Sequence, residues 1–442
     1  MKIVFVMVLI LTHLYGENEE LRLGKQIKDQ LIEDSKRARS VREIVEQVGE
    51  VEEKEIVKVD SFNKMFEEGV LAGKIRAMYS EYDYKSSSSR VYATAIGGTL
   101  KYELAQFNGF NAGVAISAIH DIDLLTGNGE KFNPGLSSSQ GSYTQLTEAY
   151  LNYKYKDLNL RGGRQVLETP LADSDDIRMV SNTFEAYVAT FKFRRWTFMA
   201  GKLQQWQGSD ADLDKSWQST GDDGTYFGGV SLSKVLLDFD LWYYDFSQDT
   251  SANNTIGNIA NTSGYISLSL HGNASEDVFL HVDMQYLHQE ESDNSAIETD
   301  IYGVTAEVEV NGLGFSVAYN QSEKEEGKGS FSGYGGGTLY TNMDNMILDN
   351  ITLDRQARAI VAGVTYSIES LGFLYAYGDF YGKSNSFGEK EHIVEQDIGV
   401  EYIFNDDLVL AAIYVISEDK ERVPENDDYD WKNMRVWLNY SF

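Results

Sequence analysis

The sequence predicts an all-β protein: a transmembrane antiparallel β-barrel of about eighteen strands, preceded by a short N-terminal helical segment. Three observations support this prediction. Apolar and polar residues alternate with a period of two from about residue 69 to the end, and short turns alternate with long polar links. The 442 residues also include 28 Tyr and 21 Phe but only 3 Pro, a composition that favours strands.

The composition excludes several classes of protein. Asp and Glu total 69 against 38 Lys and Arg, which gives a formal net charge of −31. Binding to nucleic acid requires a basic surface, so we expect no nucleic-acid partner. The chain has no cysteine, which removes disulfides, thiol nucleophiles and thiolate metal sites.

Residues 1–16 have the layout of a secretory signal peptide. Lys2 precedes an apolar run, Ile3–Leu11, and Gly16 precedes an acidic stretch. The alternative is a membrane anchor, but a spanning helix needs about 20 apolar residues and this run has roughly half that number. We therefore expect export in a Gram-negative bacterium.

Residues 17–68 form a charged leader that we expect to be helical and periplasmic. Its apolar residues follow the i, i+3, i+4, i+7 spacing of an amphipathic helix, at Val41, Ile44, Val45, Val48 and Val51. Two interpretations stay open: a solvated leader helix, and a short coiled coil or cell-wall tether.

Residues 69–442 form the predicted barrel. Along residues 73–82, for example, Ile75, Ala77 and Tyr79 alternate with Lys74, Arg76 and Met78. Strands of roughly ten residues can cross an outer membrane at a tilt. The predicted strands are 73–82, 91–106, 109–120, 145–155, 157–165, 182–193, 195–206, 225–234, 236–247, 260–271, 277–289, 299–310, 313–321, 356–368, 371–381, 393–404, 408–417 and 431–442.

The connections support the same fold. Short turns such as Asn108-Gly109 and Asn311-Gly312 suit type I′ hairpins. Between them come nine long polar links, at 83–90, 121–144, 166–181, 207–224, 248–259, 290–298, 322–355, 382–392 and 418–430. Short periplasmic turns and long outer loops are typical of outer-membrane barrels, whereas a soluble sandwich or propeller would not maintain this alternation.

The last strand carries a further mark of this class. Met434, Val436, Leu438, Tyr440 and Phe442 share one face, which we expect to contact lipid. A terminal Phe442 on an alternating strand resembles the signal that bacterial barrel-assembly machinery recognises.

A barrel of this size leaves an aqueous lumen, so a channel is the expected function. If the polar face of each strand points into the lumen, one side of the lumen is a basic wall, formed by Lys74, Arg76, Lys101, Lys154, Arg161 and Arg435. It gives an opposing acidic wall of Asp238, Asp240, Asp283, Glu307, Glu309, Asp397 and Glu401. Such walls would create a transverse field; alternatively, these charges only keep the lumen wet.

Residues 161–186 contain Arg161-Gly162-Gly163-Arg164-Gln165, then Pro170, Arg178 and Thr183-Phe184-Glu185-Ala186. This stretch resembles the third-loop region of the OprD-type outer-membrane porins, including the related major porins of epsilon-group proteobacteria. The resemblance covers about Gly69 to Phe442. It implies an eighteen-stranded channel, often trimeric, with an inward third loop and a basic ladder.

The resemblance also implies a set of constriction and selectivity residues. They are Arg161, Arg164, Glu168, Asp173, Asp175, Asp176, Arg178 and Glu185. Two features depart from the family: the leader is longer than the family's usual start, and the chain is more acidic than a carboxylate-selecting channel needs.

Much of the acidity lies in the long links. Asp210, Asp212 and Asp214 have the opening spacing of a calcium loop, but Lys215 and Gly221 occupy the positions where an EF-hand requires Gly and Glu. These carboxylates are candidates for a loosely bound divalent cation, the alternative being a solvated acidic loop. No other metal or cofactor is expected.

No catalytic motif supports an enzyme: HExxH, GxSxG and Walker patterns are all missing. We therefore expect a porin for passive diffusion of small hydrophilic solutes and ions, with a preference for cations. The expected partners are outer-membrane lipid, lipopolysaccharide and two further copies of the chain in a homotrimer. The alternatives are a structural barrel that tethers the envelope and a specific channel for amino acids or small carboxylates.

Overall fold

A computed structural model gives the fold of the chain. It describes residues 57–85, 90–122, 136, 138, 139, 141–176, 178–251, 257–275, 277–323, 327–335, 337–352, 354–421 and 430–442. The predicted signal peptide (1–16), most of the predicted leader (17–56) and parts of the long links lie outside the described residues.

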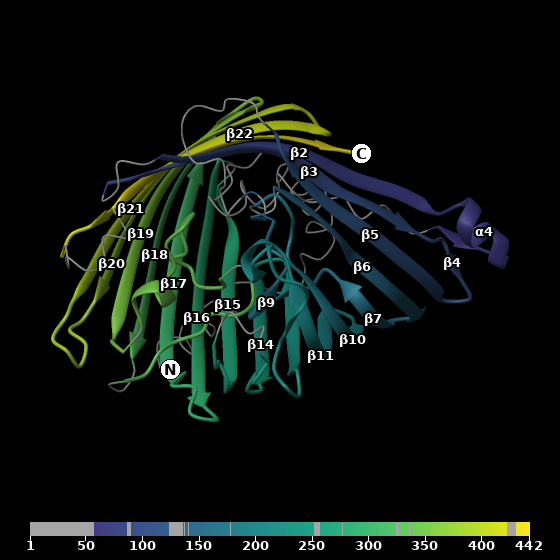
Figure 1. Cartoon of the computed structure of the whole chain (residues 1–442), viewed down its shortest axis with the longest axis horizontal. Helices are drawn as coiled ribbons and strands as arrows, with labels where there is room; N and C mark the ends of the chain where they lie inside the picture. The colour runs from purple at the N-terminus through teal and green to yellow at the C-terminus, as the bar shows by residue number, and fades with distance from the viewer. Residues whose placement is uncertain are drawn as a thin grey trace.

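Eighteen strands form a closed antiparallel barrel, which confirms the predicted fold class (Figure 1). The first of them, β2, pairs with β3 on one side and with the last strand, β23, on the other. The barrel strands are β2 (Val70–Tyr84), β3 (Arg90–Glu103), β5 (Phe110–Asp121), β6 (Ser142–Tyr155), β7 (Leu158–Gln165), β10 (Thr183–Phe193), β11 (Trp196–Gln207), β13 (Thr225–Lys234), β14 (Leu237–Phe246), β15 (Asn261–Ser275), β16 (Val278–Glu291), β17 (Thr299–Val310), β18 (Leu313–Glu323), β19 (Ala357–Ile368), β20 (Leu371–Gly382), β21 (Glu391–Asn405), β22 (Leu408–Asp419) and β23 (Trp431–Ser441).

The other elements are short. They are β1 (Lys58–Val59), α4 (Phe62–Glu67), β4 (Gln106–Phe107), β8 (Glu168–Thr169), β9 (Ala172–Asp173) and β12 (Gln218–Ser219), with 3₁₀ turns at η1 (Ser209–Ala211) and η2 (Leu348–Ile351). Among the described residues, no helix has the length and apolar character needed to cross a membrane.

Period-two alternation decides which side chains face the lumen. On β2, Ile75 points outward and is 47% exposed, whereas its neighbours Lys74 and Arg76 are 3% and 2% exposed. The last strand behaves in the same way: Met434 and Leu438 are exposed on the outer face, and Arg435 is buried inside. The predicted lipid-facing set of the last strand is therefore the outward-facing set.

The tight turns follow from residues that tolerate positive φ. Asn108 and Gly109 have φ of 50° and 89°, and Asn311 and Gly312 have φ of 51° and 77°. Positive φ at both central positions is what a type I′ hairpin requires, and Asn-Gly meets that requirement with little strain. These turns close one rim of the barrel.

Two long links fold into the barrel instead of staying at its rim. The first, residues 166–181, contains β8 and β9, and β9 is visible inside the barrel (Figure 1). The second includes residues 327–335 and 337–352. Together with the inner faces of β10 to β20 they form the largest buried apolar cluster, in which Leu171, Phe246 and Leu348 are each 0% exposed.

Candidate functional site

The candidate site begins with three basic side chains on the inner wall where the barrel closes. Lys74 and Arg76 lie on β2, and Arg435 lies on the adjacent β23. The alternation of the two strands turns all three inward, and each is at most 3% exposed. Each of these buried charges needs an ionic or hydrogen-bonding partner.

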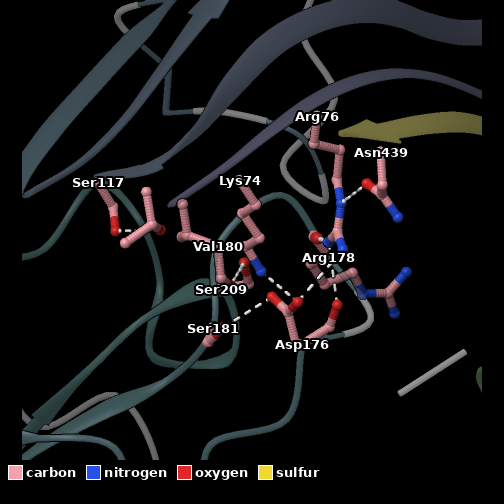
Figure 2. A network of polar contacts seen from close by, with 10 residues as sticks. Lys74, Arg76, Ser117, Asp176, Arg178, Val180, Ser181, Ser209 and Asn439 are labelled. Carbon is pink, nitrogen blue, oxygen red and sulfur yellow. Dashed lines mark hydrogen bonds and ion pairs between the residues drawn. The ribbon is translucent and has the colours of Figure 1, made fainter. Parts of the chain in front are cut away.

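The link of residues 166–181 provides the partner of Lys74 and Arg76. The Asp176 carboxylate contacts Lys74 Nζ and lies 3.2 Å from Arg76 Nη2. It also accepts a hydrogen bond of 2.7 Å from Ser181 Oγ. Figure 2 shows Lys74 and Arg76 reaching down from β2 to Asp176. The link thus runs from the ends of β7 and β10 to the inner face of β2.

Backbone carbonyls complete this network. Arg76 Nη1 donates to the Asp176 carbonyl oxygen at 3.0 Å and also to the carbonyl oxygen of Arg178. Arg76 Nε donates to Asn439 Oδ1 on β23 at 2.6 Å (Figure 2). One guanidinium therefore holds the link in place while remaining fixed to the closing strand.

Arg178 belongs to the first inner link, and its charge interacts with the second one. Burial opposes its charge, but Tyr82 and the carboxylates of Asp344, Asp210 and Asp175 outweigh burial and raise the pKa of Arg178. The guanidinium therefore stays charged. Asp344 belongs to the second inner link, so the two links meet electrostatically at Arg178.

The second inner link is bound to the wall by a different set of charges. The Asp344 carboxylate forms an ion pair with Arg435. Its backbone N–H donates to Asp397 at 3.1 Å, and the N–H groups of Asn345 and Met346 donate to Glu395 at 3.0 and 3.3 Å. This link was expected to be an ordinary outer loop, and the structure instead places it across the lumen.

The two links also contact each other through their backbones. Ala172 and Tyr334 form an isolated parallel β-bridge. The Tyr334 N–H donates to the Leu171 carbonyl oxygen at 3.0 Å, and the Asp173 N–H donates to the Tyr334 carbonyl oxygen at 2.9 Å. The links therefore form one connected structure inside the barrel.

A cavity of about 850 Å³ lies in the lumen beside the first link. Four basic side chains line it: Lys74, Lys101, Arg161 and Lys192. Lys101 Nζ pairs with Glu148 at 3.0 Å, and the Arg161 guanidinium stacks over the Tyr150 ring at 4.4 Å. The cavity is also lined by four acidic side chains: Glu103, Glu148, Glu168 and Asp176. It therefore presents both positive and negative groups to a solute.

The predicted basic wall faces the lumen. Besides the residues already described, Lys154 shares the inward face of β6 with Asn152, and it is exposed near the short-turn rim. Lys192 was missed by the sequence analysis, although alternation along β10 from Phe184, which is 0% exposed, would have placed it inward.

The predicted acidic wall also faces the lumen. Asp238 and Asp240 share the inner face of β14 with Trp242, while Leu241 points outward and is 47% exposed. Two of these carboxylates contact imidazoles: His271 lies 3.6 Å from Asp238, and His281 lies 2.7 Å from Asp283. The other inward acids are Glu307 and Glu309 on β17 and Asp397 and Glu401 on β21.

Two predicted constriction residues are wrong. Arg164 and Glu185 pair with each other at 3.3 Å, but on the outer face of β7 and β10. Arg164 also stacks on the Trp217 ring at 4.4 Å. Arg161 and Gln165 point inward, so the period of two turns Arg164 outward; likewise, Glu185 lies between the buried Phe184 and Ala186.

The remaining predicted residues of the first link are spread along it. Glu168 and Asp173 are opposite each other in the β8–β9 hairpin, and Asp175 is half-buried near Asp176. Glu168 and Asp176 line the cavity. The link therefore brings some, but not all, of the predicted acids to the lumen.

Asp210, Asp212 and Asp214 do not converge. Asp210 accepts a hydrogen bond from Asn182 at 2.6 Å, Asp214 accepts one from the Ser139 N–H at 2.7 Å, and Asp212 accepts one from the Asp214 N–H at 3.0 Å. Within the part of the chain that the structure describes, no group of three or more such side chains could hold a metal ion.

No protein-family model and no curated protein matches the sequence of the chain. Solved structures do match. OccAB2 of Acinetobacter baumannii is 15% identical with a TM-score of 0.71, covering 86% of this chain and 99% of its own. OccK9 (OpdG) of Pseudomonas aeruginosa is also 15% identical with a TM-score of 0.71, and the match covers 86% of this chain and 99% of OccK9.

OpdK of Pseudomonas aeruginosa, solved with vanillate, is 14% identical with a TM-score of 0.70, and the match covers 85% of this chain and 99% of OpdK. Identity this low establishes a likeness of fold. The chain therefore has the fold of the Occ and OprD-type outer-membrane porins, the family that the stretch around Arg161 resembles.

Proposed function

We propose that the protein is an outer-membrane porin through which small hydrophilic solutes and ions diffuse passively, with residues 166–181 as the constriction. The observation that carries the proposal is the attachment of Asp176 to Lys74 and Arg76 inside a closed eighteen-stranded barrel. A barrel of this size is wide enough for water, so an inward link narrows a channel instead of filling a solid core. The proposal includes no enzymatic activity, in line with structural neighbours that are porin channels.

The charge pairing supports a preference for cations. Lys74, Lys101 and Arg435 each have a carboxylate partner, which neutralises much of the basic wall. Asp238 and Asp283 are paired with the imidazoles of His271 and His281, and not with a lysine or arginine side chain. The lumen is therefore left with a net negative field, which the overall charge of −31 reinforces at longer range.

Single-channel recording in planar bilayers tests this proposal. We expect large, stable conductance steps from the refolded mature protein, and a reversal potential in a salt gradient that indicates cation selectivity. Silence from correctly folded barrels would contradict the channel and favour the structural tether. Steps with anion selectivity would retain the channel and reject the cation preference.

The cavity favours a second candidate, a specific channel for amino acids or small carboxylates. Lys101, Arg161 and Lys192 line it from one side of the lumen, and such groups attract carboxylates. The similar OpdK was solved with vanillate, a carboxylate. Liposome-swelling rates for a carboxylate, an amino acid and a neutral sugar of equal size would separate the two candidates: a general pore passes all three at similar rates.

We propose that the protein lies in the outer membrane and that residues 1–16 are the signal peptide that directs its export. Assembly would begin at Phe442, whose backbone exchanges two hydrogen bonds of 3.0 Å with Gly73 on the first strand. We also propose a homotrimer in contact with lipopolysaccharide. Chemical crosslinking of the protein in isolated outer membranes tests the trimer, and a band of monomer size alone would reject it.

A further inference from the structure

The helix α4 lies at the short-turn rim beside the first strands of the barrel (Figure 1). It connects β1 to β2, and Met65 is its buried side chain. The Met65 carbonyl oxygen accepts a hydrogen bond of 3.0 Å from the Ala105 N–H, which binds the helix to the chain between β3 and β4. The channel proposed above makes no use of this helix.

Two aromatic side chains of α4 remain uncovered. Phe62 is 62% exposed and Phe66 is 51% exposed. Their ring centroids are 5.4 Å apart in an edge-to-face arrangement, so they form a single apolar patch. Burial of aromatic side chains is favourable, so two exposed rings side by side indicate a surface that contacts something other than water.

The position of Tyr102 shows which side of the rim α4 occupies. Tyr102 lies next to Lys101, which lines the lumen, so alternation turns Tyr102 to the outer face together with Leu100. The Tyr102 hydroxyl donates a hydrogen bond to the Phe66 carbonyl oxygen. Gly69 sits directly against that hydroxyl, where an added Cβ would come within 2.5 Å of it. The C-terminal end of α4 is therefore attached to the outer face of the barrel.

The outer face at this rim is already apolar. Leu71 on β2, Leu100 on β3 and Phe110 on β5 are 52%, 50% and 56% exposed. Aromatic residues gather at this height of membrane barrels, where the acyl chains meet the headgroups. Phe62 and Phe66 extend this apolar surface beyond the strands. On the same helix, Lys64 pairs with Asp60 at 2.9 Å and supplies a polar side.

We infer that α4 is a membrane-interface anchor whose Phe62 and Phe66 rings insert into the phospholipid leaflet at the short-turn rim. The inference rests on the proposed membrane placement of the barrel and adds a lipid contact for a segment outside it. The anchor holds the chain just before β2 at the bilayer surface, with Lys64 and Asp60 at the headgroups. Amphipathic interfacial helices bind membranes in this way, with aromatic residues on the buried side.

Site-directed spin labelling tests the anchor in the full mature chain. The protein has no cysteine, so single substitutions label one site each. Phe62→Cys and Phe66→Cys are labelled and reconstituted into phosphatidylethanolamine–phosphatidylglycerol vesicles, and collisions with oxygen and with a water-soluble nickel chelate are compared. Leu71→Cys serves as the lipid-facing reference. Phe387→Cys, at a site 82% exposed between β20 and β21, serves as the water-facing reference.

We expect labels at residues 62 and 66 to behave like the label at 71, with nickel collisions several-fold rarer than at 387. A Lys64→Cys label on the same helix should collide with nickel much more often. Nickel access at 62 and 66 equal to that at 387, with 71 still protected, would overturn the anchor and leave the barrel in place. Nickel access at 71 as well would reject the membrane placement itself. If Phe66→Cys does not fold, Phe62→Cys alone decides the outcome.

Discussion

Arg435 on the last barrel strand and Asp344 on the second inner link form an ion pair whose side chains are only 2% and 1% exposed. The backbone of Asp344 is also held in place, because its N–H donates a hydrogen bond to Asp397 at 3.1 Å. Arg435 comes from the predicted basic wall and Asp397 from the predicted acidic wall. The second link is thus the place where the two walls are bridged.

Replacing Asp344 with Asn should release this link. Removing one partner of a buried ion pair costs about 3–5 kcal/mol when the other charge stays buried. The link can avoid that cost by moving away and letting water reach Arg435. We therefore expect Asp344→Asn to give a larger and noisier single-channel conductance. Asp223→Asn, on an exposed outer loop, serves as the control and should leave the traces unchanged. Identical traces from both variants would show that the ion pair of Asp344 and Arg435 does not hold the second link in place.

Replacing Asp176 with Asn should lower the preference for cations. The change removes a negative charge where Lys74 and Arg76 meet the first link, so their positive field reaches the permeating ions. The reversal potential in a salt gradient should move toward the anion side, and Asp175→Asn should act in the same direction but more weakly, because Asp175 is only half-buried.

Arg164→Gln provides the control for this experiment. The substitution changes the net charge of the chain by one unit, as Asp176→Asn does. The Arg164 side chain, however, lies on the outer face beside Glu185. The substitution should therefore leave the reversal potential unaltered. If Asp176→Asn is equally silent, residues 166–181 do not set the selectivity of the pore.

The strands could be predicted from sequence because their signals are local. Alternation along residues such as Lys74 to Tyr79, and Asn-Gly turns with positive φ, operate within a few residues, so the eighteen strands emerge without knowledge of their neighbours. The inward residue Asp176 came from a family resemblance instead, because nothing local specifies that a polar link turns toward the lumen.

The second inner link could not be predicted in the same way. Leu339, Met346 and Leu348 are at most 2% exposed. They are buried in one apolar cluster with residues that are distant in sequence, such as Leu171 of the first link and Phe246 of β14. Arg164 shows the opposite error. The family motif suggested the lumen, whereas strict alternation from Arg161 would have placed it on the outside.

Replacing Gly335 with Ala should separate the two inner links. Gly335 has φ of +82°, and an added Cβ would lie 2.0 Å from the Asp173 carbonyl oxygen of the first link. Gly388, in an outer loop, has the same φ of +82° but nothing within 4 Å of its Cβ position. Both substitutions carry the strain of an L-residue in the left-handed region, about 1–2 kcal/mol, and only Gly335→Ala adds a steric collision.

We therefore expect Gly335→Ala to lower the temperature at which the folded barrel shifts in unboiled gel electrophoresis by several degrees more than Gly388→Ala does. Its single-channel current should also fluctuate more. Equal shifts for the two variants would mean that backbone strain alone accounts for the effect and that the Ala172–Tyr334 bridge contributes little.

Replacing Arg161 with Gln should reduce the passage of small carboxylates more than that of neutral solutes. The Arg161 guanidinium is fixed in the cavity by stacking on Tyr150 at 4.4 Å and by a hydrogen bond of 3.3 Å to Asn152. Unlike Lys101, it has no carboxylate among these contacts, so its charge remains available to an anionic solute. An interaction of about 1 kcal/mol in a water-filled pore corresponds to about fivefold in local concentration.

Liposome swelling measures this directly. The rate for a small carboxylate should fall about threefold to fivefold in Arg161→Gln, on the same ~1 kcal/mol basis, while the rate for a neutral sugar stays constant. Arg164→Gln again serves as the matched control, because it removes the same functional group three residues away on the opposite face of β7. A uniform decrease for both solutes would indicate a change in pore width, and the cavity would then have no selective role for carboxylates.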